Sequence, residues 1–474
     1  MPAPPARPTR YRALAQTLAQ QLREGRHPPG AQLPSVRQLC ADHAVSLATV
    51  THALHELEDA GLVEARARRG YFVRAVPQPR ALPAPVPAIE LEGRRRRLME
   101  LATTQPDCLS LSHLALPAAL LPLSVMRRHA AKVLAEDRGL LATGTAFGRE
   151  ELRAQLATRA LRVGCAVEAE DIVVTQGEAE SLQLCLRLLA RPGDQVAIAS
   201  PGSLRALELI ASLGLRPLAI PSSPERGLSV QALDFALQHH AVACCIAEPS
   251  HDSVCGSALP DDERQQLAAL LARHRLPLIE CDQMGDLHRG TQRPRPVKAW
   301  DADDWVLYCG SLACVTGPGT NVGWIASRRH RLLLRAARTV HGDLLPPLTE
   351  AVLARFLASR AFDLHLRRLR QRLAAQTAAW LAAARHHLPR GSRIHAGQGG
   401  YVLWVELPEG HDAGAALQQV RRQGYTFVPG TVFGSDGAFG HCLRLSAAHP
   451  LDPARERGLQ VLGAALRGMR RAAR

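Results

Sequence analysis

The sequence predicts an α/β protein in which a small helical module with a terminal hairpin precedes a mostly parallel β-sheet covered by helices on both faces. Three observations support this prediction. Residues 10–75 show short helical periods followed by a basic hairpin, residues 76–97 are rich in Pro and Arg, and from about Gly148 short apolar strands alternate with helical segments. Such alternation is typical of parallel sheets, because each parallel strand needs a crossover connection.

Length and charge narrow the class of protein. The chain has 474 residues, 46% of them hydrophobic, with a formal net charge of +15 and a pI near 10, which is enough for two or three domains. Arginine supplies nearly all of the positive charge, because Lys132 and Lys298 are the only lysines. The charge favours a polyanionic partner, but since the whole chain is rich in Arg and Ala, charge alone identifies no function.

The cysteines and the apolar segments indicate the compartment. Eleven cysteines form no CxxC pair, so we expect reduced thiols without a disulfide framework or a metal site. The first residues, MPAPPARPTRYR, lack the apolar region of a signal peptide, and no run approaches the roughly 20 apolar residues of a membrane helix. We expect a cytoplasmic protein without a membrane segment.

The N-terminal module is predicted to contain three helices. Residues 11–24 and 36–42 have helical apolar spacing, and Ser35 and Ser46 are good N-caps for the second and third helices. The third helix is expected to present Thr49, Thr51 and His52 outward while Val50, Ala53, Leu54 and Leu57 pack inward.

A basic hairpin follows these helices. The stretch GLVEARARRGYFVRAV carries three Arg within four residues. A helix, a turn, a second helix and a basic wing is the geometry that lays one helix in a major groove with the wing beside it. Arginines in the wing neutralise phosphates, and short hydroxyl side chains reach phosphates or base edges. We therefore predict binding to double-stranded DNA; a helical interaction module without nucleic acid is the alternative.

Seven strands are predicted for the main sheet, with helices between several of them. The strand candidates are residues 172–175, 195–199, 216–220, 242–247, 276–280, 306–309 and 322–326, and the helix candidates include 178–190, 204–212, 263–274 and 328–339. Long helices are expected after Thr349 to about His387, followed by a small α+β unit with strands near 401–406 and 443–446.

The N-terminal module resembles the GntR winged helix-turn-helix family. The stretch GAQLPSVRQLCADHAVSLATVTHALHELEDAGLVEARARRGYFV follows that pattern over some 45 residues, with one departure at Leu47, where the family usually has Arg or Lys. The candidate DNA-binding residues, from this match and from the basic wing, are Ser35, Arg37, Ser46, Thr49, Thr51, His52, Arg66, Arg68, Arg69 and Gly70.

A winged helix, a Pro-rich linker and a long α/β domain together resemble the MocR subgroup of GntR regulators, whose large domain resembles fold-type I aminotransferases. The motifs DIVVTQGEAESLQL, RPGDQVAIASPG, LIECDQMGDLHRG and VLYCGSLACVTGPGTNVGW carry this resemblance. It implies a winged helix at 10–75, a linker at 76–97, a large domain at 98–350 with the seven-stranded sheet, and a small C-terminal domain at 351–474. It also implies a homodimer.

The resemblance implies pyridoxal 5'-phosphate as the family cofactor, yet the residues that would hold it are changed. Cys314 stands where the family has the lysine that forms the imine, and a thiol forms no imine. Cys281 stands at the position of the Asp that contacts the pyridine nitrogen, with Asp282 beside it, and Met284 replaces the Tyr. A one-residue slip that brought Asp282 into place would turn its side chain to the other face of the sheet.

The phosphate cup is changed as well. Asn321 replaces the phosphate-binding Arg, Glu178 and Ala179 replace a small residue and a Gln, and Ser203 replaces the stacking aromatic. A helix N-terminus favours an anion by up to about 2 kcal/mol. A Glu178 carboxylate about 4 Å from one phosphate charge would oppose it by roughly 4 kcal/mol at an effective dielectric near 20. No covalently held cofactor is therefore expected.

The sequence predicts a DNA-binding regulator with a non-catalytic aminotransferase-like domain that dimerises and senses a small-molecule effector. Arg444, in CLRLS, matches the family residue that grips the substrate carboxylate, and an interdomain salt bridge is its alternative role. Two further alternatives are a pyridoxal phosphate enzyme with an appended DNA-binding domain and a redox or metal sensor built on Cys281, Cys309 and Cys314, which we expect at neighbouring strand ends. The simplest account of these cysteines is that they are small apolar side chains that fill the space left by the cofactor and its polar partners.

Overall fold

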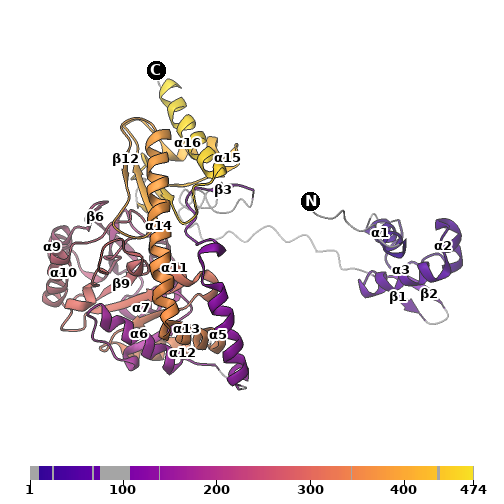
Figure 1. Ribbon diagram of the computed structural model, residues 1–474, viewed down its shortest axis with the longest axis horizontal. Helices are drawn as coiled ribbons and strands as arrows, with labels where there is room; N and C mark the ends of the chain where they lie inside the picture. The colour runs from indigo at the N-terminus through magenta and orange to yellow at the C-terminus, as the bar shows by residue number, and fades with distance from the viewer. Residues whose placement is uncertain are drawn as a thin grey trace. The chain divides into compact units, whose positions relative to one another are not determined.

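The structure is a computed structural model that describes residues 10–23, 26–66, 69–74, 107–137, 139–142, 144–342, 344–434 and 438–472 (Figure 1). The chain divides into two compact units, Met1–Glu90 and Leu91–Arg474. The linker expected at 76–97 lies outside the described residues. Within the described ranges, no helix is long and apolar enough to cross a membrane.

The first unit contains the predicted three helices and hairpin. Its elements are α1 (Arg10–Arg23), α2 (Val36–His43), α3 (Leu47–Asp59), β1 (Val63–Arg66) and β2 (Gly70–Val73), with β1 and β2 antiparallel. Ser35 and Ser46 cap α2 and α3 as predicted, because each hydroxyl oxygen accepts a hydrogen bond from the backbone N–H three residues on. The apolar side of α3 is buried against α1 and β1, as the spacing predicted.

The second unit is built on an eight-stranded mixed sheet, one strand more than predicted. All seven predicted strands are present, and the two-residue strand β7 adds an antiparallel edge beside β6. β11 is antiparallel to both of its neighbours, whereas β10, β9, β8, β5 and β6 run parallel to one another. In spatial order the strands are β4 (Ile172–Thr175), β11 (Gly323–Ala326), β10 (Val306–Ser311), β9 (Leu278–Asp282), β8 (Val242–Ala247), β5 (Gln195–Ser200), β6 (Arg216–Ser223) and β7 (Gly227–Leu228).

Strand β9 starts and ends two residues later than the predicted 276–280. Helix α10 (Asp261–His274) ends at Arg275, whose φ of 51° is left-handed, and Leu276 and Pro277 lead into the strand. The shift places Cys281 and Asp282 inside β9. Because successive side chains of a strand point to opposite faces, these two residues belong to different sides of the sheet.

Helices cover both faces of this sheet, as predicted (Figure 1). On the face that carries Cys281 and Cys309 lie α7 (Glu178–Leu189), α8 (Leu204–Ser212) and α12 (Arg331–His341). On the other face lie α6 (Glu150–Arg162), α9 (Val230–His239), α10, α13 (Pro347–Ala358) and α14 (Arg360–His387). The predicted long helices after Thr349 correspond to α13 and α14.

A second, four-stranded sheet forms the C-terminal part, and the two strands predicted there are its centre. Its order is β12 (Arg393–His395), β13 (Val402–Glu406), β16 (Cys442–Ser446) and β15 (Val428–Pro429). The remaining elements are β3 (Leu109–Ser110), paired with β14 (Tyr425–Thr426), and the helices α5 (Leu123–Glu136), α11 (Ala313–Thr316), α15 (Ala413–Arg421) and α16 (Pro453–Ala472).

Candidate functional site

The start of α3 presents short polar side chains, and three of them already make local hydrogen bonds. The hydroxyl oxygen of Ser46 accepts from the backbone N–H of Thr49 at 3.3 Å and lies 2.8 Å from its hydroxyl. Thr51 donates to the backbone carbonyl of Leu47 at 2.9 Å. His52 is exposed, and its ring lies 5.5 Å from that of Tyr11. These contacts fix the side chains in place without covering the outer surface of the helix.

The wing carries exposed cationic groups. Arg66 lies over the Phe72 ring at 4.4 Å and donates from its Nε to Glu64 at 2.7 Å. Arg69 is exposed at the turn, beside Gly70, whose φ of +92° favours glycine. Arg37 is exposed in the first turn of α2. Arg68 lies outside the described residues.

Cys314 lies in α11, directly after the carboxyl end of β10. Its sulfur is 3.6 Å from the phenolic oxygen of Tyr401, which donates to it, and 4.0 Å from the amide oxygen of Gln283. Burial raises the pKa of the Cys314 thiol to about 11, and the hydrogen bond from Tyr401 offsets only part of this effect. At neutral pH the group is therefore a protonated thiol, which is a weak nucleophile.

The three cysteines of the predicted sensor lie on or just after the neighbouring strands β9 and β10. Cys281 and Cys309 are paired in register across β9 and β10, and the Cys309 sulfur lies 3.8 Å from that of Cys185 on α7. Burial raises the pKa of the Cys281 thiol well above its usual value. The sulfur of Cys314, just after the carboxyl end of β10, contacts Tyr401 and Gln283. The three cysteines therefore lie on neighbouring strands and their ends, as expected, and a sensor role for them stays a prediction.

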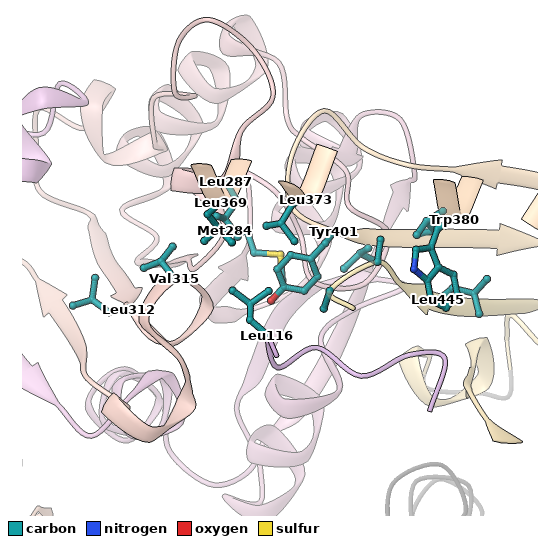
Figure 2. Packing of buried hydrophobic residues seen from close by; sticks show 14 of the residues in the cluster. Leu116, Met284, Leu287, Leu312, Val315, Leu369, Leu373, Trp380, Tyr401 and Leu445 are labelled. Atoms are coloured by element: carbon teal, nitrogen blue, oxygen red, sulfur yellow. The ribbon is translucent and has the colours of Figure 1, made fainter. Parts of the chain in front are cut away.

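Met284 and Asp282 both have partners within the protein: Met284 packs in an apolar cluster, and Asp282 accepts hydrogen bonds. Figure 2 shows Met284 among Leu287, Leu369 and the ring of Tyr401 in the largest apolar cluster. Its side chain is 2% exposed. The Asp282 carboxylate accepts from Arg293 at 2.7 Å and from the Tyr308 hydroxyl at 2.7 Å, on the face opposite to Cys281. The slip that would bring Asp282 beside a cofactor ring is absent from β9.

The N-terminus of α7 carries an acid. Glu178 is the first residue of the helix, and its carboxylate lies 3.6 Å from Arg205 Nε. Burial raises the pKa of Glu178, and Arg205 opposes this shift. Ala179 is half-buried in the same turn. Asn321 donates to the backbone carbonyl of Gln176 at 3.0 Å, so it closes the loop in front of α7.

A second acid, Glu248, was not predicted from the sequence. It follows β8 directly, and its carboxylate accepts from the Ser253 backbone N–H at 2.8 Å and from the Ser253 hydroxyl at 3.2 Å. Burial, then Glu178 and Asp252, raise the pKa of Glu248 to about 8. The signal in the sequence is a Glu placed immediately after an apolar strand, at the edge where parallel strands end.

Arg444 and Ser203 border the same region. Arg444, on β16, donates to the backbone carbonyl of Ser253 at 3.0 Å and lies over the Phe433 ring at 5.0 Å. Its hydrogen-bond partner is therefore a backbone carbonyl of the large domain, and the two roles considered for Arg444, carboxylate binding and an interdomain salt bridge, stay predictions. Within the described part of the chain, its Nε has no hydrogen-bond partner. Ser203 is the N-cap residue of α8 and lines a small cavity together with Glu248.

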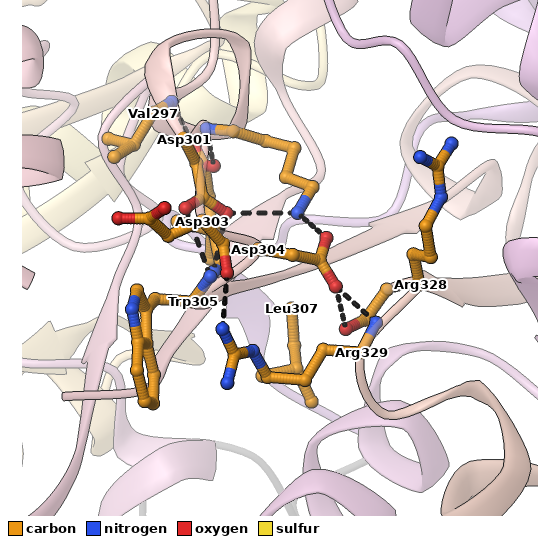
Figure 3. A network of polar contacts seen from close by, with 12 residues as sticks. Val297, Asp301, Asp303, Asp304, Trp305, Leu307, Arg328 and Arg329 are labelled. Carbon is orange, nitrogen blue, oxygen red and sulfur yellow. Dashed lines mark hydrogen bonds and ion pairs between the residues drawn. The ribbon is translucent and has the colours of Figure 1, made fainter. Parts of the chain in front are cut away.

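The two lysines lie elsewhere. Lys298 donates to Asp301 at 2.9 Å and to Asp304, and its side chain is 5% exposed. Figure 3 shows the surrounding network, in which Asp301 and Asp304 join the start of β10 to Arg329. This network is at the amino end of β10, whereas Cys314 follows the carboxyl end. Lys132 is on α5, with a 66% exposed side chain.

The fold and the site define a class: a winged helix joined in one chain to an aminotransferase-type α/β domain. The family model "Aminotransferase class I and II" matches residues 97–462, and "Bacterial regulatory proteins, gntR family" matches residues 10–73. The chain belongs to the GntR-type HTH transcriptional regulators that carry an aminotransferase-like domain, the MocR-like group. Pyridoxal phosphate is the cofactor of the aminotransferase fold family.

Full-length relatives share both parts of the chain. The HTH-type transcriptional regulators YjiR and YdcR of Escherichia coli K12 are each 31% identical, over 97% and 96% of this chain and 99% and 98% of their own. The α-aminoadipate aminotransferase LysN of Thermus thermophilus superposes with a TM-score of 0.72 and 25% identity, over 80% of this chain and 95% of its own. A kynurenine aminotransferase of Pyrococcus horikoshii gives a TM-score of 0.74 at 22% identity, over 80% and 95%, which supports the fold.

Proposed function

We propose that this protein is a sequence-specific DNA-binding transcriptional regulator whose aminotransferase-like domain has lost covalent pyridoxal phosphate chemistry. In this proposal residues 10–75 bind DNA and residues 76–97 are the linker. Residues 98–350 and 351–474 are the large and small parts of a domain that dimerises and binds an effector. The candidate contacts to DNA are the exposed groups at the start of α3, in the wing and at Arg37.

One observation carries the loss of the cofactor. An imine with the cofactor aldehyde requires a lysine amine, and both lysines of the chain are accounted for. Lys298 is held between two carboxylates at the opposite end of β10, and Lys132 is on the surface of α5. A β-strand rises about 3.3 Å per residue, so the length of β10 separates Lys298 from the site.

The remaining positions do not fit the cofactor either. Its pyridine nitrogen would meet the neutral Cys281 thiol in place of a carboxylate. Its phosphate would lie at the N-terminus of α7 beside Glu178. Glu178 also raises the pKa of the buried Glu248. An ionised Glu178 carboxylate opposes a dianionic phosphate more strongly than the helix N-terminus favours it. We therefore derive no chemical step through this group.

Absorbance and borohydride trapping test the loss of covalent chemistry. Purified protein incubated with pyridoxal phosphate is expected to stay colourless after gel filtration, and borohydride is expected to fix no adduct on any residue by mass spectrometry. A visible band that borohydride converts into a modified lysine would instead support the alternative, a pyridoxal phosphate enzyme fused to a DNA-binding domain.

Selection from random duplexes followed by gel shifts at several salt concentrations tests DNA binding. Each neutralised phosphate is expected to contribute about 0.9 to the slope of log affinity against log salt. A dimer with two winged helices is expected to select paired half-sites, because tethering raises the effective concentration of the second module. Binding that is indifferent to salt and to sequence would contradict the proposal.

The thiol-sensor alternative has less support. Burial raises the pKa values of Cys281 and Cys314, and a sensor cysteine needs a lowered thiol pKa and access to oxidant. Among the described residues, no three His, Cys, Asp or Glu side chains are grouped so as to hold a metal ion. These cysteines fit the simpler role of refilling space with small apolar groups.

A further inference from the structure

A separate cavity of about 320 Å³ lies on the face of the central sheet opposite to Cys281. Its walls come from α6 and α14, and its floor includes Asp282 at the end of β9 and Tyr308 within β10. Gln283, which contacts Cys314, also borders it, so the cavity adjoins the former cofactor region without being part of it. Its volume is at the lower end of the range of natural small-molecule sites.

The two inner acids of the cavity are already neutralised. Arg293 donates to Asp282 at 2.7 Å and to Asp286 at 2.8 Å. Arg159 donates to the second oxygen of Asp286 at 3.1 Å, and the Tyr308 hydroxyl donates to Asp282 at 2.7 Å. Every Asp282 and Asp286 oxygen therefore has a donor, including Asp282 Oδ1, which accepts a backbone N–H.

The other charged groups leave the cavity positive. Its lining contains five arginines against three aspartates: Arg159, Arg162, Arg293, Arg367 and Arg370, and Asp282, Asp286 and Asp363. Among the aspartates that line the cavity, Asp363 is the one beside the exposed Arg162, and it lies 3.7 Å from both Arg159 and Arg162. Arg159 Nη1 is buried and has no hydrogen-bond partner in the described part of the chain.

Arg370 is a further cation in the cavity wall, and other arginines repel its charge. Its Nε donates to the backbone carbonyl of Asp286 at 2.6 Å, which holds the guanidinium at the cavity wall. Burial lowers the pKa of Arg370; Asp286 opposes this shift, and Arg159 and Arg293 add to it. An anion placed between these guanidinium groups would relieve their repulsion.

We propose that this cavity binds a small organic anion with two or more negative charges, carried by phosphate or carboxylate groups. Guanidinium groups bind such groups through paired, charge-assisted hydrogen bonds. Leu156, Val163 and Leu366 in the walls match the carbon body of a metabolite.

The position of the cavity suits an effector. Helix α14 forms one wall and also contacts β12 and β13 of the C-terminal sheet (Figure 1). An anion that joins α6 to α14 would therefore stabilise one placement of the C-terminal sheet against the central sheet. This effector role rests on the proposed regulator function, whereas binding of the anion does not.

Calorimetric titration of the full-length protein with pyrophosphate and, separately, with citrate tests the proposal in the absence of DNA. The test variant is R162A/R367A, because both side chains are exposed and their loss leaves the inner ion pairs intact. The matched control is R368A/R372A, which removes the same charge from exposed positions of α14 that line a different groove. Circular dichroism melts verify that both variants are folded.

We expect saturable binding of at least one probe, weakened at least tenfold in R162A/R367A and less than twofold in R368A/R372A. The stronger probe identifies phosphate or carboxylate as the preferred group. Equal weakening in both variants, or no saturable binding of either probe, would overturn the proposal. The titration contains neither DNA nor pyridoxal phosphate. A failure of anion binding is therefore distinguishable from a failure of the proposed regulator function.

Discussion

The phenolic hydroxyl of Tyr401, the residue directly before β13, lies 3.6 Å from the sulfur of Cys314 and donates to it. Tyr401 is fully buried, and burial raises its pKa well above the usual value, so it stays a neutral donor. This contact ties the loop after β10 to the region of the C-terminal sheet. The position at which the resemblance places the family's lysine thus holds a neutral thiol that is hydrogen-bonded to a neutral phenol.

This pair predicts slow alkylation of Cys314. With a pKa of about 11, about one thiol in 10,000 is ionised at pH 7. We expect iodoacetamide to modify Cys314 in the native protein at least 100-fold more slowly than in the same chain unfolded in urea, measured by peptide mass spectrometry. The native rate is expected to rise about tenfold per pH unit between pH 7 and 10. Fast modification at neutral pH would favour the redox-sensor alternative.

Glu248 predicts a pH dependence of stability. Its folded pKa, about 8, exceeds the usual value of a carboxyl group. Between pH 4.5 and 8 the folded state therefore holds a proton that the unfolded state has released, so stability falls as pH rises through this window. The glutamine of E248Q does not titrate, so we expect this loss to be absent in the variant. The difference in free energy of unfolding, E248Q minus wild type, is expected to be larger at pH 8 than at pH 5 by on the order of 1–3 kcal/mol. Urea unfolding at both pH values measures the difference.

Replacing Lys298 is predicted to lower the stability of the fold, because its ammonium group is the cation between two carboxylates. In K298M, Asp301 would keep a buried carboxylate next to Asp304 without its cation, which costs about 3–5 kcal/mol. The matched change K132M removes an exposed lysine from an i,i+4 pair with Glu136 and is expected to change stability by less than about 0.5 kcal/mol. Urea midpoints compare the two variants. A small effect of K298M would mean that the buried network contributes little.

Local sequence signals predicted the elements well because each rests on short-range physics. Ser46 caps α3, and the spacing of Val50, Ala53 and Leu57 buries one side of that helix. β8 was placed to the residue, since an apolar run bounded by polar residues leaves little choice. β9 was misplaced by two residues because the left-handed turn at Arg275 is not visible in hydrophobic periodicity.

The sites were less predictable, because they depend on contacts between distant segments. Glu248 carries no spacing signal that links it to Glu178, 70 positions earlier, and only the sheet brings their charges together. The second cavity joins Arg159 of α6 to Arg370 of α14, two helices separated by most of the central sheet. Helical periodicity identifies which side of each helix is apolar, but not which helix it faces.

The N-cap of α3 allows stability and DNA binding to be separated. Ser46 accepts the Thr49 backbone N–H, so S46A is expected to lower the stability of the N-terminal module by about 1 kcal/mol. An aspartate is an equally good cap but adds a negative charge where DNA phosphates are expected to lie. S46D is therefore expected to keep the melting temperature and to weaken operator binding at least tenfold by gel shift. Retained affinity in S46D would remove Ser46 from the DNA interface.

A single lysine at position 314 is not expected to restore the cofactor. In C314K the new ammonium group would lie near Glu178 and Glu248, whose charges already act on this position, so the amine would be held protonated by an ion pair. Protonated amines do not add to aldehydes, and the phosphate would still face Glu178. We expect C314K to remain colourless with pyridoxal phosphate, and C314K/C281D/E178S to gain a visible aldimine absorbance band that borohydride removes. Absorbance in the single variant would show that the lysine alone was missing and that Glu178 does not exclude the phosphate.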